Sequence, residues 1–201
     1  MFGEYRQRST RLLETAVATT STIKVPTGVL KLDDHIAILS TNNDYRGAEE
    51  FIVSGITTTA LVDTVTLDFP LQNDHFGSAA LYPSDSTCDT RAEVIVLNSN
   101  VKIVGDSTQE LGATFVVTDY RTKDGSTELK ARGTVNIDSI EMENCSQEDT
   151  NKGCIRFETS TYEESSYDSS YAEAVQAKRI KQVSNSAFHG GLGIGLNIED
   201  S

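Results

Sequence analysis

The 201-residue sequence has no tryptophan, only three prolines, and 17 basic residues against 30 acidic ones. The net charge of −13 would repel a polyanion, which argues against nucleic acid as a partner. No apolar run approaches the roughly 20 residues of a membrane-spanning helix, so we expect no membrane contact from this segment itself. An acidic surface ordinarily serves solubility, although calcium or a cationic partner would also suit it.

Cysteine is scarce, and the count of three argues against a closed disulfide framework. Cys145 and Cys154 bracket the polar loop SQEDTNKG and could form a disulfide in an oxidising compartment, which would leave Cys88 over. A glycosylation sequon begins at Asn144 and ends at Ser146. Both features favour secretion.

A signal-peptide core is also missing, because the opening residues MFGEYRQRSTRLLETA are charged. If the protein acts outside the cell or at its surface, we expect the chain to be part of a longer secreted or membrane-anchored one.

What the sequence does contain is β-forming residues in short runs. The first half holds STIKV, HIAIL, EEFIVSGITT, LVDTVTLDF, AEVIVLN and VKIVG, separated by turn-forming stretches. In TVTLDF the alternation predicts Val65, Leu67 and Phe69 on one face of a strand. EVIVL is more continuously apolar and predicts a strand that is covered on both faces. The sequence therefore predicts an all-β fold.

The second half has four further β-like runs, TVNIDSIEMEN, GCIRFETS, KRIKQVSNSAF and LGIGLNIEDS. Ile137 and Ile140 in the first match Ile180 and Val183 in the third, at an offset of 43 residues. This repeat predicts successive turns of a right-handed parallel β-helix, a solenoid whose turns stack by parallel pairing. The glycines of GGLGIG predict a tight corner, because a nucleotide-binding loop would open a helix and this run precedes a strand.

A polar, tyrosine-rich loop at about 160–178 separates the second and third runs. Its end, YAEAVQAKRIK, has helix-forming composition, so we expect a surface excursion with one short helix. We expect Tyr162, Tyr167 and Tyr171 on a solvated face, although exposed tyrosines beside serine and aspartate would also suit a recognition loop. The acidic runs EMENCSQED and TYEESSYD match no established calcium loop, so a solvated face is the expected reading, with a calcium-dependent binding module as an alternative.

Several motifs resemble, in the right order, the later part of an eight-glycine (G-eight) domain. They are RSTRLLETA, STIKV, DDHIAILST, TVTLDFPLQNDHFG and RAEVIVLNSNVKIVGD, and they cover roughly residues 5 to 106. Such domains occur in fibrocystin, in fibrocystin-like proteins and in cell-surface hyaluronidases. The family's opening strands would precede residue 1. The resemblance implies the later part of this domain at 1–106, as a β-rich cap, and the start of parallel β-helix repeats at 107–201.

His75 is the first candidate site residue, and a metal reading would pair it with Asp74. No ligand spacing of established type accompanies them. We therefore expect a turn histidine whose ring bonds backbone groups beyond the strand that ends near Pro70.

His189 and Glu158 are the second candidates, because the hyaluronidase branch implies a catalytic region here. That branch has histidines on the preceding turn, and GCIRFETS has none. A sugar-cleaving site also needs positioned carboxylates or a metal-bound group. The expected function is therefore a non-catalytic structural or ligand-binding segment, without cofactor, of a fibrocystin-like surface protein that contacts an extracellular protein or glycan. The alternative is a hyaluronidase-like enzyme acting on polysaccharide.

Overall fold

The computed structural model of the chain describes residues 1, 3–42, 44–78, 89–106, 108, 112–118, 120–124, 127–131, 133, 135–159 and 181–200. These residues form an all-β protein, in which a short 3₁₀ turn, η1 (Tyr45–Gly47), accompanies the strands. The described part of the chain contains no helix that is long and apolar enough to span a membrane. The chain divides into two compact units: a sheet unit, Tyr5–Asn98, and a stack unit, Met1–Glu4 with Ser99–Ser201.

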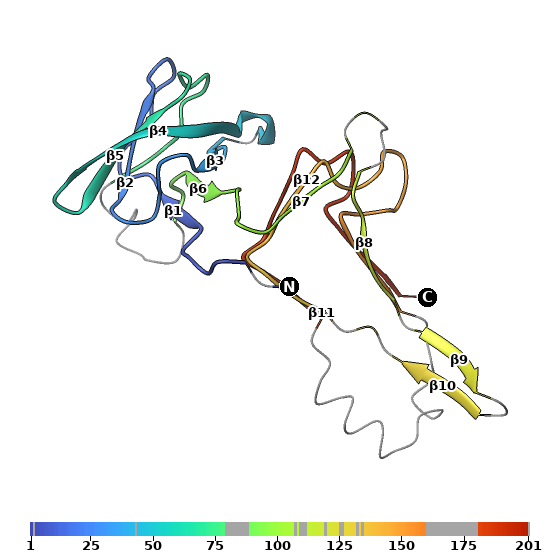
Figure 1. The fold of residues 1–201 in the computed structure, drawn as a ribbon. Helices are drawn as coiled ribbons and strands as arrows, with labels where there is room; N and C mark the ends of the chain where they lie inside the picture. The colour runs from blue at the N-terminus through green and yellow to red at the C-terminus, as the bar shows by residue number, and fades with distance from the viewer. Residues whose placement is uncertain are drawn as a thin grey trace. The chain divides into compact units, whose positions relative to one another are not determined.

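The sheet unit is one antiparallel sheet with the strand order β1-β6-β3-β4-β5-β2 (Figure 1). Its strands are β1 (Ser9–Arg11), β2 (Thr22–Pro26), β3 (His35–Ile38), β4 (Glu49–Thr59), β5 (Val62–Leu67) and β6 (Glu93–Val96). Beyond β1, Leu13 N donates to Lys24 O of β2 at 2.8 Å. The two edge strands thus approach each other at this point, but the sheet remains open.

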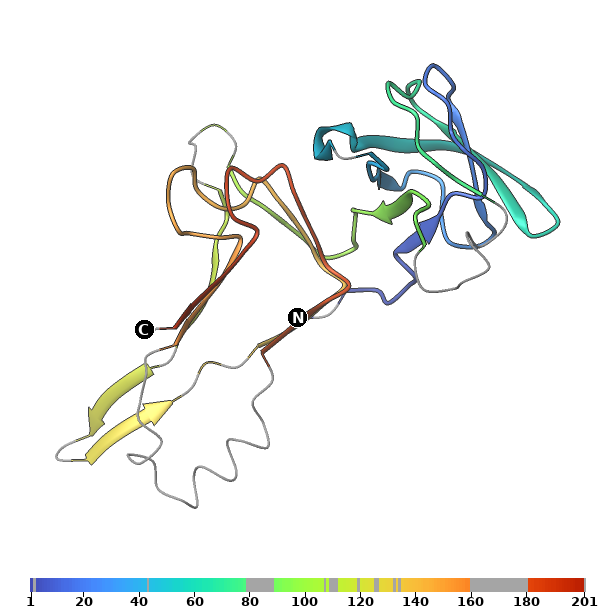
Figure 2. The same ribbon diagram turned by 180° about the vertical axis from the view of Figure 1, so that it is seen from behind.

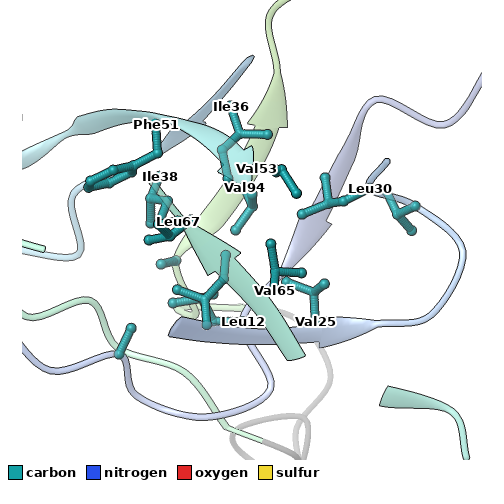
Figure 3. Close-up of a cluster of buried hydrophobic side chains, with 14 of the residues drawn as sticks. Leu12, Val25, Leu30, Ile36, Ile38, Phe51, Val53, Val65, Leu67 and Val94 are labelled. Atoms are coloured by element: carbon teal, nitrogen blue, oxygen red, sulfur yellow. The ribbon is translucent and has the colours of Figure 1, made fainter. Parts of the chain in front are cut away.

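Apolar side chains from every strand of the curled sheet or its flanking turns meet in one core (Figure 3). The period of two explains which residues enter it, since alternate residues of a strand point to the same face. In β5, Val65 and Leu67 are buried, and Val94 and Val96 of β6 alternate in the same way. The alternation predicted for β5 is therefore present over Val65 and Leu67.

Phe69 departs from that alternation, because its side chain is 67% exposed. The prediction that it shares the buried face with Leu67 is wrong. β5 ends at Leu67. Asp68 N still donates to Ile52 O, but Asp68 Oδ1 replaces the backbone carbonyl as the acceptor from Ile52 N, so backbone pairing with β4 stops here. The chain beyond Leu67 thus no longer follows the strand's period.

The stack unit is built from three parallel sheets in which strands far apart in the sequence lie side by side (Figures 1 and 2). The first sheet contains β7 (Lys102–Val104), β12 (Glu141–Glu143) and β15 (Ala187–His189). The second contains β8 (Phe115–Thr118), β13 (Ile155–Thr159) and β16 (Leu196–Asp200). The third pairs β11 (Val135–Asp138) with β14 (Lys181–Ser184). β9 (Tyr120–Asp124) and β10 (Thr127–Ala131) form a separate antiparallel hairpin.

Rows of apolar side chains run across these parallel sheets at matched register. Met142 pairs with Ile103 on one side and with Phe188 on the other. Ile155 pairs likewise with Phe115 and Leu196. Met142 and Ile155 are fully buried and belong to one core, which is separate from that of the sheet unit. Burial of these rows stabilises the parallel pairing.

The sequence offset between the paired strands β11 and β14 is longer than the sequence predicted. Ile137 pairs with Val183, so its predicted match to Ile180 is wrong, and Ile180 itself lies outside the described residues. Ser139 and Asn185 lie at corresponding corners directly after the paired strands β11 and β14, and both have left-handed φ values, 58° and 48°. Ile140 lies beyond that corner, so the apolar spacing of a single strand could not set the register.

Two other sequence expectations concern segment boundaries. β7 pairs with β12 and belongs to the stack unit, so the division between the two compact units lies between Asn98 and Ser99. The polar loop at about 160–178, with its expected helix and tyrosines, lies outside the described residues. At the start of the chain, Gly3 N donates to Asp138 O and Asp138 N donates to Met1 O, at 2.9 and 3.2 Å. The first residues thus extend the sheet of β11.

Candidate functional site

The sheet of β7, β12 and β15 gathers charged side chains on one of its faces. The register places Lys102 beside Glu141 and places Glu143 beside His189. These residues alternate along the strands with the buried row at Met142, so they point to the opposite face from that row. We call Lys102, Glu141, Glu143 and His189 the charged cluster.

Glu141 lies at the centre of this cluster, and its side chain is 1% exposed. Its Oε1 accepts a hydrogen bond from Lys102 Nζ at 2.9 Å and lies 2.8 Å from His189 Nε2. Its Oε2 accepts from the backbone N of Ser99 at 2.9 Å. A buried carboxylate is costly unless such donors surround it, and here donors reach both oxygens.

The hydrogen bonds fix the charges of the cluster. Burial alone would raise the pKa of Glu141, but hydrogen bonds from Lys102, Ser99 and His189 outweigh it and hold the pKa below its ordinary value. Hydrogen bonds to Glu143 and Glu141 raise the pKa of Lys102 above its ordinary value. The pKa values of the carboxylate and the ammonium are thus both displaced away from neutral pH, so both groups stay charged. A proton-transfer group instead needs a pKa near the working pH.

Three members of the cluster could hold a metal ion. Glu141, Glu143 and His189 each offer a ligand atom, and these atoms lie within 4.8 Å of one another. A nitrogen and two carboxylate oxygens suit a divalent metal such as zinc. However, Lys102 Nζ makes ion pairs with both carboxylates, so a metal would have to displace it. The cation of this arrangement is the lysine ammonium.

His189, which the sequence singled out, is thus part of the cluster, but Glu158 is not. Glu158 lies on β13 in a different sheet, where its Oε1 is 2.9 Å from Arg156 Nε. The structure therefore does not bring the two candidate catalytic residues into one sheet. Lys102, Glu141 and Glu143 were missed, because only the stacking register brings them together.

His75 and Asp74, the candidate metal ligands, make hydrogen bonds to different partners. His75 is fully buried, with Nδ1 3.1 Å from Leu39 O and Nε2 3.1 Å from Glu49 Oε1. A carbonyl oxygen only accepts, so Nδ1 carries a proton. Asp74 Oδ1 instead accepts from Ala18 N at 2.7 Å. His75 therefore ties the turn after β5 to the end of β3 and the start of β4.

Glu49, the partner of His75, is also held in its charged form. Burial would raise its pKa, but hydrogen bonds from Gln72 N, His75 and Asn73 lower it below its ordinary value. Asn73 donates through both its backbone N and its Nδ2 to Glu49 Oε1, at 2.8 and 3.1 Å. This carboxylate is therefore a fixed anchor for the turn.

Cys145 and Cys154 form a disulfide, with Cα atoms 4.8 Å apart, and both residues are buried. Cys88 lies outside the described residues. In the sequon, Asn144 occupies a corner with φ of 49°, and Ser146 is fully buried. The sequon therefore lies at a packed corner of the stack unit, immediately after β12.

No protein-family model matches the chain. No curated protein matches it either.

Proposed function

We propose that the chain is a non-catalytic structural or ligand-binding segment of a larger extracellular or cell-surface protein, of the kind that its resemblance to fibrocystin-like proteins implies. In this proposal the stack unit is the beginning of a right-handed parallel β-helix, and the sheet unit corresponds to the later part of a G-eight domain. The stack serves as a scaffold, and its polar loops and exposed edges contact an extracellular protein or a glycan.

The observation that carries the proposal is the matched register of the three parallel sheets. β11, β12 and β13 follow one another in the chain, and each pairs in parallel with β14, β15 and β16, respectively. Recurrent corners accompany the strands, since Ser139 and Asn185 share a left-handed backbone. A chain that repeats strand, corner and strand in this way is the arrangement expected of a solenoid.

An open apolar edge supports the same proposal. Leu196 and Ile198 of β16 pair with the buried Ile155 and Phe157 of β13. They are nevertheless 46% and 70% exposed. Large apolar side chains that continue a buried row into solvent suit a surface against which a further strand or partner packs. This edge is therefore a candidate contact surface of the scaffold.

The disulfide supports an extracellular location, because disulfides persist in oxidising compartments and are rare in reducing ones. A calcium-dependent binding module is the further alternative, in which loop carboxylates would hold the ion. The charged cluster favours a structural role over a catalytic one, because the pKa values of Glu141 and Lys102 are displaced away from neutrality.

Incubation of the chain with hyaluronan and with other acidic glycans tests the proposal against its enzymatic alternative. We expect no change in polymer length by gel filtration over long incubation. The matched variants are Glu158→Gln and His189→Ala, which alter the two residues of the alternative. Depolymerisation by the unaltered chain that either variant abolishes would establish the enzymatic function instead.

A further inference from the structure

The corner after β12 contains the glycosylation sequon, which begins at Asn144 and ends at Ser146. Asn144 is half-buried and has a left-handed φ of 49°. Its backbone N donates to His189 O at 3.3 Å, and its carbonyl oxygen accepts from Ala113 N at 3.1 Å. These bonds hold the main chain at the corner and do not use the side-chain amide.

The neighbouring turns of the stack leave room beside that amide. Continued by one residue, the register of β12 with β7 and β15 places Asn144 in a row with Gly105 and Gly190. A Cβ atom on Gly190 would lie 3.2 Å from Asn144 Oδ1, so a side chain there would crowd the amide. Glycine on both sides therefore leaves the row open around Asn144.

Ser146, the third residue of the sequon, is fully buried in the folded chain. Cβ atoms on Gly191 and Gly193 would each lie 3.5 Å from Ser146 Oγ, so the loop after β15 covers the hydroxyl. Glycan transfer requires the asparagine amide together with the hydroxyl two residues later. The folded corner therefore withholds the sequon from the transferring enzyme.

The folded structure does not account for a serine at this position. Ser146 Oγ has no hydrogen-bond partner among the residues that the structure describes. Burying an unpaired hydroxyl costs free energy of folding, and alanine would avoid that cost. We therefore expect the hydroxyl to act before the corner folds, when the sequon is open.

The middle residue of the sequon adds an order of events. Cys145 forms a disulfide with Cys154, at a sequence separation of 9, and both cysteines are buried. Closing this disulfide fixes the corner in its folded form, together with the buried Ser146. Transfer of a glycan to Asn144 therefore has to come before the disulfide.

We propose that Asn144 is an N-glycosylation site that is filled before the disulfide between Cys145 and Cys154 closes. Asn144 Nδ2 forms a bond to the anomeric carbon of an oligosaccharide carried on a lipid pyrophosphate. The bond from that carbon to the pyrophosphate oxygen breaks, Nδ2 loses a proton, and the lipid pyrophosphate leaves. The chain then folds with the glycan in the row of glycines. This inference rests on the extracellular location in the proposed function, because such transfer occurs in the secretory pathway.

Translation of the full 201-residue chain behind a cleavable signal peptide tests the site, in microsomes that contain the transferase and its lipid donor. We expect a glycosidase-sensitive increase in mass, which reductant enhances because reduced cysteines keep the corner open for longer. Asn144→Gln should abolish the increase. The signal peptide directs the chain into the microsomes wherever the natural protein resides. A failure here would therefore leave the proposed scaffold function standing.

The folded chain supplies the contrast, with purified transferase and lipid donor added to the oxidised protein. The comparison is the double variant Asn144→Gln, Glu148→Asn, which moves the sequon to Glu148, an exposed residue in the loop between the cysteines. We expect transfer to the unaltered folded chain to be at least about 100-fold slower than to this variant, because Asn144 reacts only when the corner opens.

Ser146→Ala separates a role of the hydroxyl in glycosylation from a role in folding. We expect it to abolish the glycan and to leave the urea midpoint of the unglycosylated chain unchanged or raised. A lowered midpoint would show that the folded chain needs the hydroxyl. That result, equal transfer to the folded chain and to the Glu148→Asn variant, or absence of glycan from the reduced chain in microsomes would each overturn the proposal.

Discussion

Glu141 is the residue that most clearly separates a structural role from a catalytic one. A buried carboxylate beside a histidine and a lysine has the composition of an active site. However, donors reach both of its oxygens, and Lys102 also pairs with Glu143. These contacts satisfy the charges within the cluster instead of holding a proton ready for transfer. The cluster therefore joins β7, β12 and β15 through polar contacts, as the apolar row joins them on the opposite face.

Replacing Glu141 by glutamine tests this role. The substitution removes one of the two carboxylates that pair with Lys102, so that Glu143 is the remaining partner of the lysine in the cluster. Lys102 is 41% exposed and keeps its ion pair with Glu143, so we expect the loss of the charged hydrogen bonds to Glu141 to lower the unfolding free energy by about 1.5–3 kcal/mol. Urea unfolding measures it. Glu148→Gln is the matched control, because Glu148 is exposed, and it should change stability by less than about 0.5 kcal/mol. Equal effects of the two substitutions would contradict the structural role.

The displaced pKa values also predict how stability depends on pH. Glu141 and Glu49 have folded-state pKa values below their ordinary value of 4.5, so the folded chain binds fewer protons there than the unfolded chain does. Their contribution is complete above pH 4.5 and is lost as the pH falls through the folded-state values. Lys102 behaves oppositely, since its raised pKa gives stability that disappears as the pH rises beyond 10.5.

Urea midpoints measured between pH 7 and pH 3 check this dependence. We expect a progressive fall below pH 5, and a shallower fall in the Glu141→Gln variant, which has one carboxylate fewer to protonate. Asp89 should contribute to the fall in stability at the lowest pH values measured, because hydrogen bonds from Arg91 lower its pKa to about 2. Identical slopes for the variant and the unaltered chain would show that Glu141 is not held as proposed.

At the scale of elements, sequence reasoning located strands well where apolar residues alternate. STIKV, HIAIL and EEFIVSGITT correspond to β2, β3 and β4. β1 was missed because Ser-Thr-Arg is short and polar, and its strand form comes from pairing with β6. β8 and the hairpin of β9 and β10 were also missed. Strand identity in β1 and in the hairpin depends on partners, and a local pattern does not contain that information, whereas β8 reads Phe-Val-Val-Thr, a local β signal that was overlooked.

The disulfide is the covalent element of the stack unit, and it closes a short loop between β12 and β13. By the loop-entropy relation, a loop of this size should contribute about 2–3 kcal/mol. The double variant Cys145→Ser, Cys154→Ser should therefore unfold at lower urea concentration than the oxidised chain. Reductant provides the control: it should lower the midpoint of the unaltered chain and leave that of the double variant unchanged. An unchanged urea midpoint of the unaltered chain after addition of reductant would contradict this contribution.

At the scale of the whole molecule, the charged cluster could not have been predicted from the sequence. Lys102, Glu141 and His189 lie on three separate strands, and only the register of the stacked sheets makes them neighbours. The predicted repeat was displaced because Ile140 and Ile137 were treated as one strand, although the corner at Ser139 separates them. Local alternation of apolar residues was enough to predict the all-β class. Predicting the site would have required the pairing register of strands that are far apart in the sequence.

The two units have separate buried cores, which predicts that their stabilities respond separately to core substitutions. Val65→Ala removes buried methyl groups from the sheet unit, and Met142→Ala does so in the stack unit. Each should cost about 2–4 kcal/mol within its own unit. Hydrogen exchange followed by mass spectrometry would resolve the units. Equal loss of protection in both units from either substitution would indicate one cooperative core instead.

The parallel stack is the central claim, because both the charged cluster and the proposed scaffold function depend on it. Residue-resolved amide hydrogen exchange of the unaltered chain tests it most directly. β12 and β13 lie between two parallel partners, whereas β15 and β16 lie at the edges of their sheets. We compare amides whose N–H donates to a neighbouring strand of the same sheet. We predict that those of β12 and β13 exchange at least tenfold more slowly than those of β15 and β16, because central strands open only with larger unfolding events. Uniform exchange across these four strands, or faster exchange in β12 than in β15, would contradict the stack.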